Sequence, residues 1–394
     1  MGSDMRVAII HYWLVGMRGG ERVLEALCEL FPNADIYTHV YDPAQISETI
    51  NSHKVRTTFI QRLPMATRLY RRYLPLMPIA LEQIDLRGYQ LVLSNESGPV
   101  KGVIRDPGAL HICYCLTVPR YLWDMYHNYL EESGPVTRML MRLIIHYLRI
   151  WDYASAARVD HFIADSRFAA DRIAAYYRRT AEVIYPPVDV ESFRSTAARE
   201  DFYLMVGELV RYKRFDLAVQ AFNAMGKPLV IIGKGPELKS LRRQAGPNVT
   251  LLGNQPASVL REHYARARAL IFPGIEDFGL VPVEAMASGC PVIAYRGGGA
   301  LETVVEGRTG IFFEEQSCDS LIEAIGRFER DEHRFSTQAM VEHARNFGRE
   351  KFKRLMSQAI ERELAARKRP EARSSEMQKD RIAMNGNRFC GLTR

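Results

Sequence analysis

The chain has 394 residues, of which 47% are hydrophobic and 25% are charged, and its formal net charge at pH 7 is +7. This length exceeds what one ordinary core accommodates and predicts two domains, and the composition is typical of a globular protein. The basic balance favours a partner with phosphates or an anionic surface. Since no recognised base-reading motif accompanies the charge, we expect no nucleic-acid partner.

Targeting and covalent features are sparse. The sequence has no run of about 18 uninterrupted apolar residues, and residues 1–5 (MGSDM) lack the apolar core of a secretory signal. Six cysteines in a chain of this length do not indicate a disulfide framework. Cys113 and Cys115 flank Tyr114 in an apolar run that predicts a buried strand rather than a metal site. We therefore expect a reducing, cytoplasmic compartment and no bound metal.

The first half of the chain alternates short apolar runs with helical stretches. The run RVAIIHY at residues 6–12 predicts a buried parallel strand, followed by a helix at residues 21–31. A later helix is expected at residues 167–177, with Ser166 as its N-cap. Further strands are predicted at residues 35–40, 90–94, 110–115 and 161–164. This alternation indicates a parallel sheet with helices on both faces.

The pattern breaks at residues 183–193 (VIYPPVDVESF), where two adjacent prolines predict a stiff linker. The alternation then resumes. Strands are expected at residues 203–206, 229–232, 249–252, 269–272, 291–294 and 310–313. The sequence therefore predicts two consecutive α/β domains. Because such sheets bind ligands at the carboxyl ends of their strands, two facing sheets predict a cleft between the domains.

The most informative stretch is PGIEDFGLVPVEAMASG at residues 273–289, which follows a predicted strand and enters a helix with Pro282 near its first turn. The start of a helix presents backbone N–H groups and suits a diphosphate. Glu276 lies in the loop and Glu284 in the helix. A carboxylate accepts hydrogen bonds from two vicinal hydroxyls, as in a ribose or a sugar ring. Either glutamate alone would be taken as a solvated residue, but together these features predict a site.

A second stretch, VGELVRYKRFD at residues 206–216, again combines strand, glycine, loop and helix. Arg211, Lys213 and Arg214 cluster after Gly207 at the carboxyl end of the predicted strand, where a departing diphosphate needs positive charge. A solvated basic turn is the alternative interpretation. We assign the charge-neutralising role to Lys213 and Arg211, and take Arg214 as a surface residue.

Other glycines give weaker signals, because glycine also serves tight turns. Gly233 follows the run LVII, and Gly253 and Asn254 follow VTLL, where their backbone could contact a base. Gly19 and Gly20 open the first helix, but the full G-x-G-x-x-G is absent and no P-loop lysine follows. A dinucleotide or ATP site is therefore disfavoured. The pair is expected to approach donor phosphates from the opposite wall of the cleft.

Together these segments resemble the retaining glycosyltransferases of family 4, which have the two-domain fold called GT-B. The motif E-x7-E joins Glu276 to Glu284, and further similarity lies in VGELVRYKRFDLAVQAF, GCPVIAYRGGGALETV, VIYPPVD and the RGGE at residues 18–21. The similarity extends to about residue 360. The most similar subgroup is that of bacterial mannosyltransferases and related transferases of surface-polysaccharide assembly.

The resemblance implies a Rossmann-like, acceptor-binding domain at residues 5–190 and a Rossmann-like, nucleotide-sugar-binding domain at residues 191–345. A helix at residues 346–367 is expected to cross back to the first domain. Residues 368–394 have little apolar periodicity and are expected to be disordered.

Site roles also follow from the resemblance. Glu284 would hold the nucleotide ribose, Glu276 the hydroxyls of the donor sugar, and Lys213 the diphosphate. Backbone N–H groups for the sugar and phosphate would come from Phe278, Gly279 and Leu280. The donor is expected to be a nucleotide sugar, GDP-mannose before UDP-sugars, and such enzymes generally need no metal.

Two positions depart from the family pattern. Glu208 stands where an arginine usually follows the glycine of the first loop in the second domain, and Arg211 is a candidate to supply the missing charge. Leu116 stands where the subgroup has a histidine that reaches the donor sugar. Because leucine forms no hydrogen bond, His11 or Asn95 would have to make that contact, or the donor differs, or activity is impaired.

A basic and apolar stretch indicates contact with a membrane. Residues 137–151 (TRMLMRLIIHYLRIW) carry Arg138, Arg142, His146 and Arg149 at helical spacing. Residues 68–77 add Arg71 and Arg72. Such a stretch can lie on an anionic membrane, which predicts a peripheral location on the inner face of the plasma membrane. The alternative is a helix whose apolar face packs into the first domain.

These observations predict transfer of a hexose to a lipid-linked or membrane-proximal glycan, with retention at the anomeric carbon. An epimerase or hydrolase of nucleotide sugars with the same fold remains an alternative. So does a non-catalytic relative that binds nucleotide or glycan, an interpretation motivated by Leu116 and Glu208.

Overall fold

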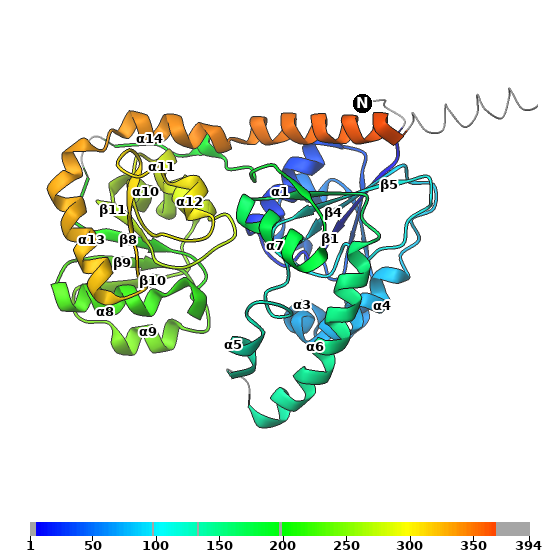
Figure 1. Cartoon of the computed structure of the whole chain (residues 1–394), viewed down its shortest axis with the longest axis horizontal. Coiled ribbons are helices and arrows are strands. Elements are labelled where there is room, and N and C mark those ends of the chain that lie inside the picture. The colour runs from blue at the N-terminus through cyan, green and yellow to red at the C-terminus, as the bar shows by residue number, and fades with distance from the viewer. Residues whose placement is uncertain (1–4, 97, 132–133, 197–198, 368–394) are drawn as a thin grey trace, which may run out of the picture.

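The computed structural model describes residues 5–96, 98–131, 134–196 and 199–367. The predicted disordered tail at residues 368–394 lies outside this part of the chain. Two α/β domains stand side by side, and near the end of the described chain a helix over the second domain is followed by a longer helix that runs along the first (Figure 1).

The first domain is built on a seven-stranded parallel sheet with the order β3-β2-β1-β4-β5-β6-β7. Its strands are β1 Val7–His11, β2 Asp35–Thr38, β3 Lys54–Thr57, β4 Leu91–Glu96, β5 Leu110–Cys115, β6 His161–Ala164 and β7 Ala181–Val183. All five predicted strands are present. The sequence did not reveal β3 and β7, because these short edge strands are partly exposed and lack a continuous apolar run.

The helices of this domain include the predicted ones. They are α1 Gly19–Leu30, α2 Glu48–Asn51, α3 Ala66–Leu69, α4 Met77–Glu82, α5 Tyr126–Glu131, α6 Pro135–Ala156 and α7 Arg167–Tyr177. The hydroxyl of Ser166 accepts a hydrogen bond from the backbone N–H of Ala169 at 3.1 Å, so the predicted cap of α7 is confirmed.

The second domain has a six-stranded parallel sheet with the order β10-β9-β8-β11-β12-β13. Its strands are β8 Tyr203–Val206, β9 Leu229–Ile232, β10 Val249–Gly253, β11 Ala269–Phe272, β12 Val292–Tyr295 and β13 Gly310–Phe313. Its helices are α8 Phe215–Met225, α9 Leu238–Gln244, α10 Ala257–Arg266, α11 Leu280–Ala287, α12 Ala300–Thr303, α13 Cys318–Asp331 and α14 Thr337–Ala344. All six predicted strands are present. Because β8 and β11 are neighbours, the two motif loops that follow them lie side by side at one edge of the sheet.

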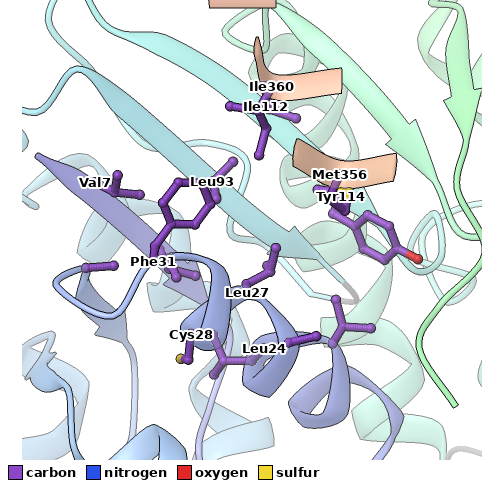
Figure 2. Close-up of a cluster of buried hydrophobic side chains, with 14 of the residues drawn as sticks. Val7, Leu24, Leu27, Cys28, Phe31, Leu93, Ile112, Tyr114, Met356 and Ile360 are labelled. Carbon is purple, nitrogen blue, oxygen red and sulfur yellow. The ribbon is translucent and has the colours of Figure 1, made fainter. Parts of the chain in front are cut away.

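A helix at residues 349–367 links the second domain back to the core of the first (Figure 1). Figure 2 shows Met356 and Ile360 of this helix packed with Leu27 of α1 and Ile112 of β5. Arg349 and Glu29 form an ion pair at 2.6 Å beside this core. The domains are therefore joined twice, by the linker and by this helix.

Helix α6 lies at the far side of the first domain and packs on the segment Tyr70–Leu76 through Leu74, Ile145 and Leu148. It buries only one of its faces. Among the described residues, no helix combines the length and apolarity that crossing a membrane requires.

Candidate active site in the interdomain cleft

A cleft with a volume of about 680 Å³ lies between the domains, at the carboxyl ends of strands from both sheets. The first domain contributes the start of α1 and the residues after β5. The second contributes the loops after β8 and β11 and the first turns of α11. Of the residues predicted for the site, the cleft is lined by Gly19, Gly20, Gly207, Lys213, Glu276, Phe278, Gly279, Leu280 and Glu284.

Two helix starts meet across this cleft. A Cβ atom on Gly19 would lie 2.8 Å from Cδ1 of Leu280, so the first residue of α1 already touches the first residue of α11. On Gly20 a Cβ would lie 2.3 Å from the hydroxyl oxygen of Tyr12. Side chains at these two positions would fill the space between the helices. Each helix start carries partial positive charge, so the gap favours a diphosphate.

Glu276 and Lys213 form an ion pair in the cleft, with 2.9 Å between Oε1 and Nζ. Burial alone would lower the pKa of Lys213, but the carboxylate of Glu276, together with Tyr212 and Glu208, outweighs that effect and the pKa is raised. A Cβ on Gly207 would lie 3.1 Å from Nζ of Lys213, so glycine leaves the ammonium group its space. A charged lysine is therefore held where it can move from Glu276 to an incoming anion.

The loop of Glu276 rests on a second glycine loop, which follows β12. The backbone N–H of Gly299 donates to the carbonyl of Glu276 at 2.9 Å. Gly298 has a φ of 61° there, and a Cβ on it would lie 2.4 Å from the same carbonyl oxygen. Only glycine combines this left-handed backbone with so close an approach.

Glu284 is held by a tyrosine from α10. The hydroxyl of Tyr264, which is fully buried, donates to Oε2 of Glu284 at 2.8 Å. Burial raises the pKa of Glu284, and the hydrogen bond from Tyr264 opposes part of that rise. The carboxylate is thus oriented before any ligand arrives.

Four predicted site residues lie outside the lining of this cleft. Arg211 is exposed and lines a neighbouring cavity beyond Tyr212, so the structure does not bring it to Glu276. Gly233 packs behind the site, where a Cβ would lie 1.8 Å from the carbonyl oxygen of Gly207; its role is packing. Gly253 ends β10 with a φ of 70°, and the adjacent Asn254 is exposed.

The unusual Glu208 faces arginines of the opposite domain. Its carboxylate oxygens lie 3.9 Å from Arg18 and 3.6 Å from Arg71. Arg18 also lines the cleft, whereas the predicted substitute Arg211 does not. Positive charge near this loop is therefore supplied by arginines of the first domain.

Leu116 lines the cleft as predicted, but neither proposed replacement for the missing histidine does. His11 and Asn95 are fully buried and bond to each other at 3.2 Å, and His11 lies 3.4 Å from Glu21. The alternative in which one of them reaches the donor sugar is contradicted, because both are buried against the start of α1; a different donor and impaired activity are the alternatives that stay open. Asp165, which adjoins Leu116 at the ends of β5 and β6, lines the cleft instead.

Sequence reasoning missed a set of charged residues that join the domains. Asp277 of the second domain forms ion pairs with two arginines of the first domain, Arg120 at 2.8 Å and Arg172 at 2.7 Å. Burial, and then the proximity of Asp277, raise the pKa of Asp165 well above its usual range. Asp277 stands in the stretch at residues 273–289 from which the site was predicted. No feature of the sequence indicated that Asp277 pairs with Arg120 and Arg172, since more than a hundred residues separate Asp277 from either partner.

Glu302 adds a second bridge between the domains. Its carboxylate accepts hydrogen bonds from the backbone N–H groups of Arg167 at 2.8 Å and Phe168 at 3.1 Å, at the start of α7. A carboxylate from the second domain thus satisfies a helix start in the first. Together with the ion pairs of Asp277, this contact holds the two domains against each other beside the cleft.

Comparison with known proteins identifies both halves of the chain. Residues 17–192 match the family model described as Glycosyltransferase Family 4, and residues 189–354 match the model described as Glycosyl transferases group 1. Between them the two models span most of the chain, and they meet at the linker.

Curated relatives include two mannosyltransferases. A GDP-mannose-dependent alpha-(1-6)-phosphatidylinositol monomannoside mannosyltransferase of Mycobacterium tuberculosis is 31% identical over 201 residues, which are 43% of this chain and 52% of the relative. The O-antigen chain mannosyltransferase RfbU of Salmonella typhimurium is 28% identical over 159 residues, 37% of this chain and 45% of the relative. The chain thus spans about half the length of the curated relatives it matches.

Solved structures share the fold. Anabaena HepE in complex with UDP and glucose aligns with a TM-score of 0.67 at 16% identity, covering 91% of this chain and 100% of that one. Sucrose-phosphate synthase from Thermosynechococcus elongatus aligns with a TM-score of 0.70 at 20% identity, covering 92% and 100%. The predicted two-domain GT-B fold is confirmed.

Proposed function

The chain belongs to the family 4 glycosyltransferases, and we propose that it transfers a hexose, with mannose favoured, from a nucleoside-diphosphate sugar to a lipid-linked or membrane-proximal glycan in surface-polysaccharide synthesis. One observation carries this proposal. The Glu276–Lys213 pair lies in the same cleft as the meeting starts of α1 and α11. Such a site pairs a group for sugar hydroxyls with positive charge for a departing diphosphate.

In the proposed reaction, Glu284 receives the ribose hydroxyls and Glu276 those of the donor sugar. Lys213, Arg18 and the two helix starts stabilise the negative charge that develops on the diphosphate. The bond from the anomeric carbon to the diphosphate oxygen breaks as the acceptor hydroxyl bonds to that carbon from the same face. The acceptor proton passes to the leaving oxygen, so the configuration is retained. We propose that no metal is needed, since these groups neutralise the leaving group.

The preference for GDP-mannose is supported by the name of the Mycobacterium tuberculosis relative, and the name of RfbU supports mannose without giving the nucleotide. The HepE complex with UDP keeps UDP-sugars as alternative donors. Thermal-shift screening with GDP, UDP, ADP and their sugars should single out the donor, because a ligand that binds the folded state raises its melting temperature. Incubation of that donor with membrane lipid extract should then give a labelled glycolipid with the retained anomer, also with EDTA present. An inverted anomer would refute the mechanism, and turnover to epimer or free sugar without acceptor would replace transfer with the alternative reaction.

We also propose that α6 rests on an anionic membrane surface. The helix has two apolar faces, one of which packs on the domain through Ile145 and Leu148. The other is exposed to water: Met139 is 63% exposed, Leu143 72% and Ile150 59%. The alternative interpretation, an apolar face packed into the first domain, therefore accounts for one of the two apolar faces and leaves the other exposed. An exposed apolar stripe of this extent marks an interaction surface.

Basic residues accompany this exposed stripe. Arg142 and His146 are exposed beside it on α6, and Arg71 and Arg72 are exposed on the neighbouring segment. Positive charge beside an apolar stripe complements anionic headgroups above acyl chains. The acceptor, if lipid-linked, would then be presented on the side of the domain that carries α6.

Flotation with vesicles tests this surface. The wild type should float with phosphatidylglycerol-containing vesicles at low salt and much less with phosphatidylcholine alone or at high salt. Leu143→Glu combined with Arg142→Glu should abolish flotation. Arg242→Glu on α9, which changes an equally exposed arginine of the second domain, should not. Equal flotation of all three proteins would discard the surface.

A further inference from the structure

Arg120 donates hydrogen bonds to the two residues that flank Glu276 in its loop. One guanidinium nitrogen donates to the carbonyl of Ile275 at 3.1 Å, and the other donates to the carboxylate of Asp277 at 2.8 Å. Glu276 stands between these two acceptors in the sequence. A planar guanidinium with several fixed donors can span two such groups, which a lysine ammonium does not reproduce.

The same arginine also contacts the loop that carries Lys213. Its guanidinium carbon lies 5.0 Å from the centre of the Tyr212 ring, and Tyr212 directly precedes Lys213. This distance is within the range of a cation–π contact. One side chain of the first domain thus touches both loops whose ends form the Glu276–Lys213 pair.

Asp277 is the anchor of this arrangement. Arg120 binds one of its carboxylate oxygens and Arg172 the other, at 2.8 and 2.7 Å. Arg172 is itself held by Asp124 at 2.6 Å and by the carbonyl of Val118 at 3.1 Å. The side chain of Asp277 is only 9% exposed and that of Arg172 only 8%. Charges this buried are tolerated because they are paired, and their geometry is correspondingly fixed.

From these contacts we infer that Arg120 is a positioning residue, which aligns Glu276 with Lys213 only while the first domain is seated on the second, with Asp277 as its anchor. The inference rests on the proposed function. The first domain would thus do more than bind acceptor. Separation of the domains would withdraw the guanidinium from Ile275, Asp277 and Tyr212 together, and the donor loop would lose its alignment. Transfer would then be confined to the closed enzyme.

A double-mutant cycle on the full chain tests the coupling. Arg120→Ala and Asp277→Ala should each lower kcat by about 10- to 100-fold, because small misplacements of a reacting group have costs of this size. The double variant should be little worse than either single one, because the two residues act as one unit. Arg120→Lys should resemble Arg120→Ala although it keeps the charge. Melting temperatures of all variants separate this effect from unfolding.

A direct role of Arg120 on the substrate predicts a different pattern. Asp277→Ala would then cost little, or the two losses would multiply in the double variant, and Arg120→Lys would recover much of the activity. Any of these results overturns the positioning role.

Hydrogen exchange supplies a readout that does not depend on turnover. Amides of residues 273–280 should exchange faster in Arg120→Ala than in the wild type. Arg349→Ala is the matched control, because it removes a different contact, between the helix at residues 349–367 and the first domain. Exchange of the amides of residues 273–280 should be unchanged in this variant. If the wild type transfers no sugar but this exchange pattern appears, the proposed function is wrong and the positioning role of Arg120 is supported. If the wild type is active and exchange is unchanged in Arg120→Ala, the positioning fails alone.

Discussion

Replacing Glu284 by glutamine tests the nucleotide end of the cleft. Tyr264 holds Oε2 at 2.8 Å, and glutamine retains a carbonyl oxygen for that bond. The substitution removes the charge that strengthens hydrogen bonds from two ribose hydroxyls, and it replaces the other acceptor oxygen by an NH2 group that can only donate. A hydrogen bond to a charged group contributes about 1.5–3 kcal/mol, against about 1 kcal/mol for a neutral one. Across two hydroxyls we expect a loss of about 2 kcal/mol, or about 30-fold in Kd.

Isothermal titration with the preferred nucleoside diphosphate measures this loss, and inorganic pyrophosphate serves as the matched ligand without a ribose. Glu284→Gln should weaken the nucleotide and leave pyrophosphate unchanged. Equal weakening of both ligands would show that the substitution disturbs the start of α11 instead. If Glu284→Gln binds the nucleotide as tightly as the wild type, the assignment of the ribose to this carboxylate is wrong.

The pH dependence follows from the raised pKa of Glu284, which burial causes and Tyr264 partly offsets. The carboxylate is the form that accepts both hydroxyls, so binding is retained above this pKa and lost as the pH falls through it. The loss should therefore begin at a higher pH than the usual range of a glutamate. Tyr264→Phe removes the opposing hydrogen bond and should move the midpoint further up. Glu284→Gln should show no such transition.

Three other changes give distinct outcomes. Leu116→His places a donor and acceptor at the cleft wall and should raise kcat/KM with GDP-mannose by about tenfold, as measured by product formation; no change would mean that position 116 does not touch the sugar. Gly298→Ala forces a left-handed alanine against the carbonyl of Glu276 and should cost at least about 1–2 kcal/mol, seen as a lower melting temperature together with lost turnover. Glu29→Ala removes the partner of Arg349 and should lower stability by at most about 1 kcal/mol in urea unfolding, leaving kcat unchanged.

The sequence predicted those parts of the fold that depend on local pattern. Strands such as VAIIH at Val7–His11 are buried at every position and apolar at the first four, because helices cover both faces of the sheet. The edge strands Lys54–Thr57 and Ala181–Val183 have no such pattern, since one side of each has no neighbour. Local sequence therefore revealed the centre of the first sheet and missed both of its edges.

The candidate site divides in a similar way. Glu276 and Lys213 stand in the segments that directly follow predicted strands, and Glu284 stands in the helix after the same loop as Glu276, so topology alone brought them to one edge of one sheet. Arg211 stands in the same loop as Lys213, yet it turns outward, because residues Arg211–Lys213 form one turn of 3-10 helix whose side chains point in different directions. His11 similarly stands at the carboxyl end of a strand, but it is fully buried and lies against Glu21 of α1. Sequence position predicts the edge on which a residue lies, and local backbone geometry decides whether its side chain reaches the ligand.

The placement of charge across the cleft suggests why Glu208 is tolerated. An arginine at this position would add positive charge next to Arg18 and Arg71, which already approach from the first domain. With glutamate there, the two domains attract one another at the phosphate end, as they do at Asp277 on the sugar end. An incoming diphosphate would compete with Glu208 for Arg18. Because the diphosphate is negatively charged, like Glu208, Arg18 would still be attracted toward the second domain. Under the proposed function, donor binding would therefore replace one interdomain bridge with another, and the domains would stay together with and without the donor.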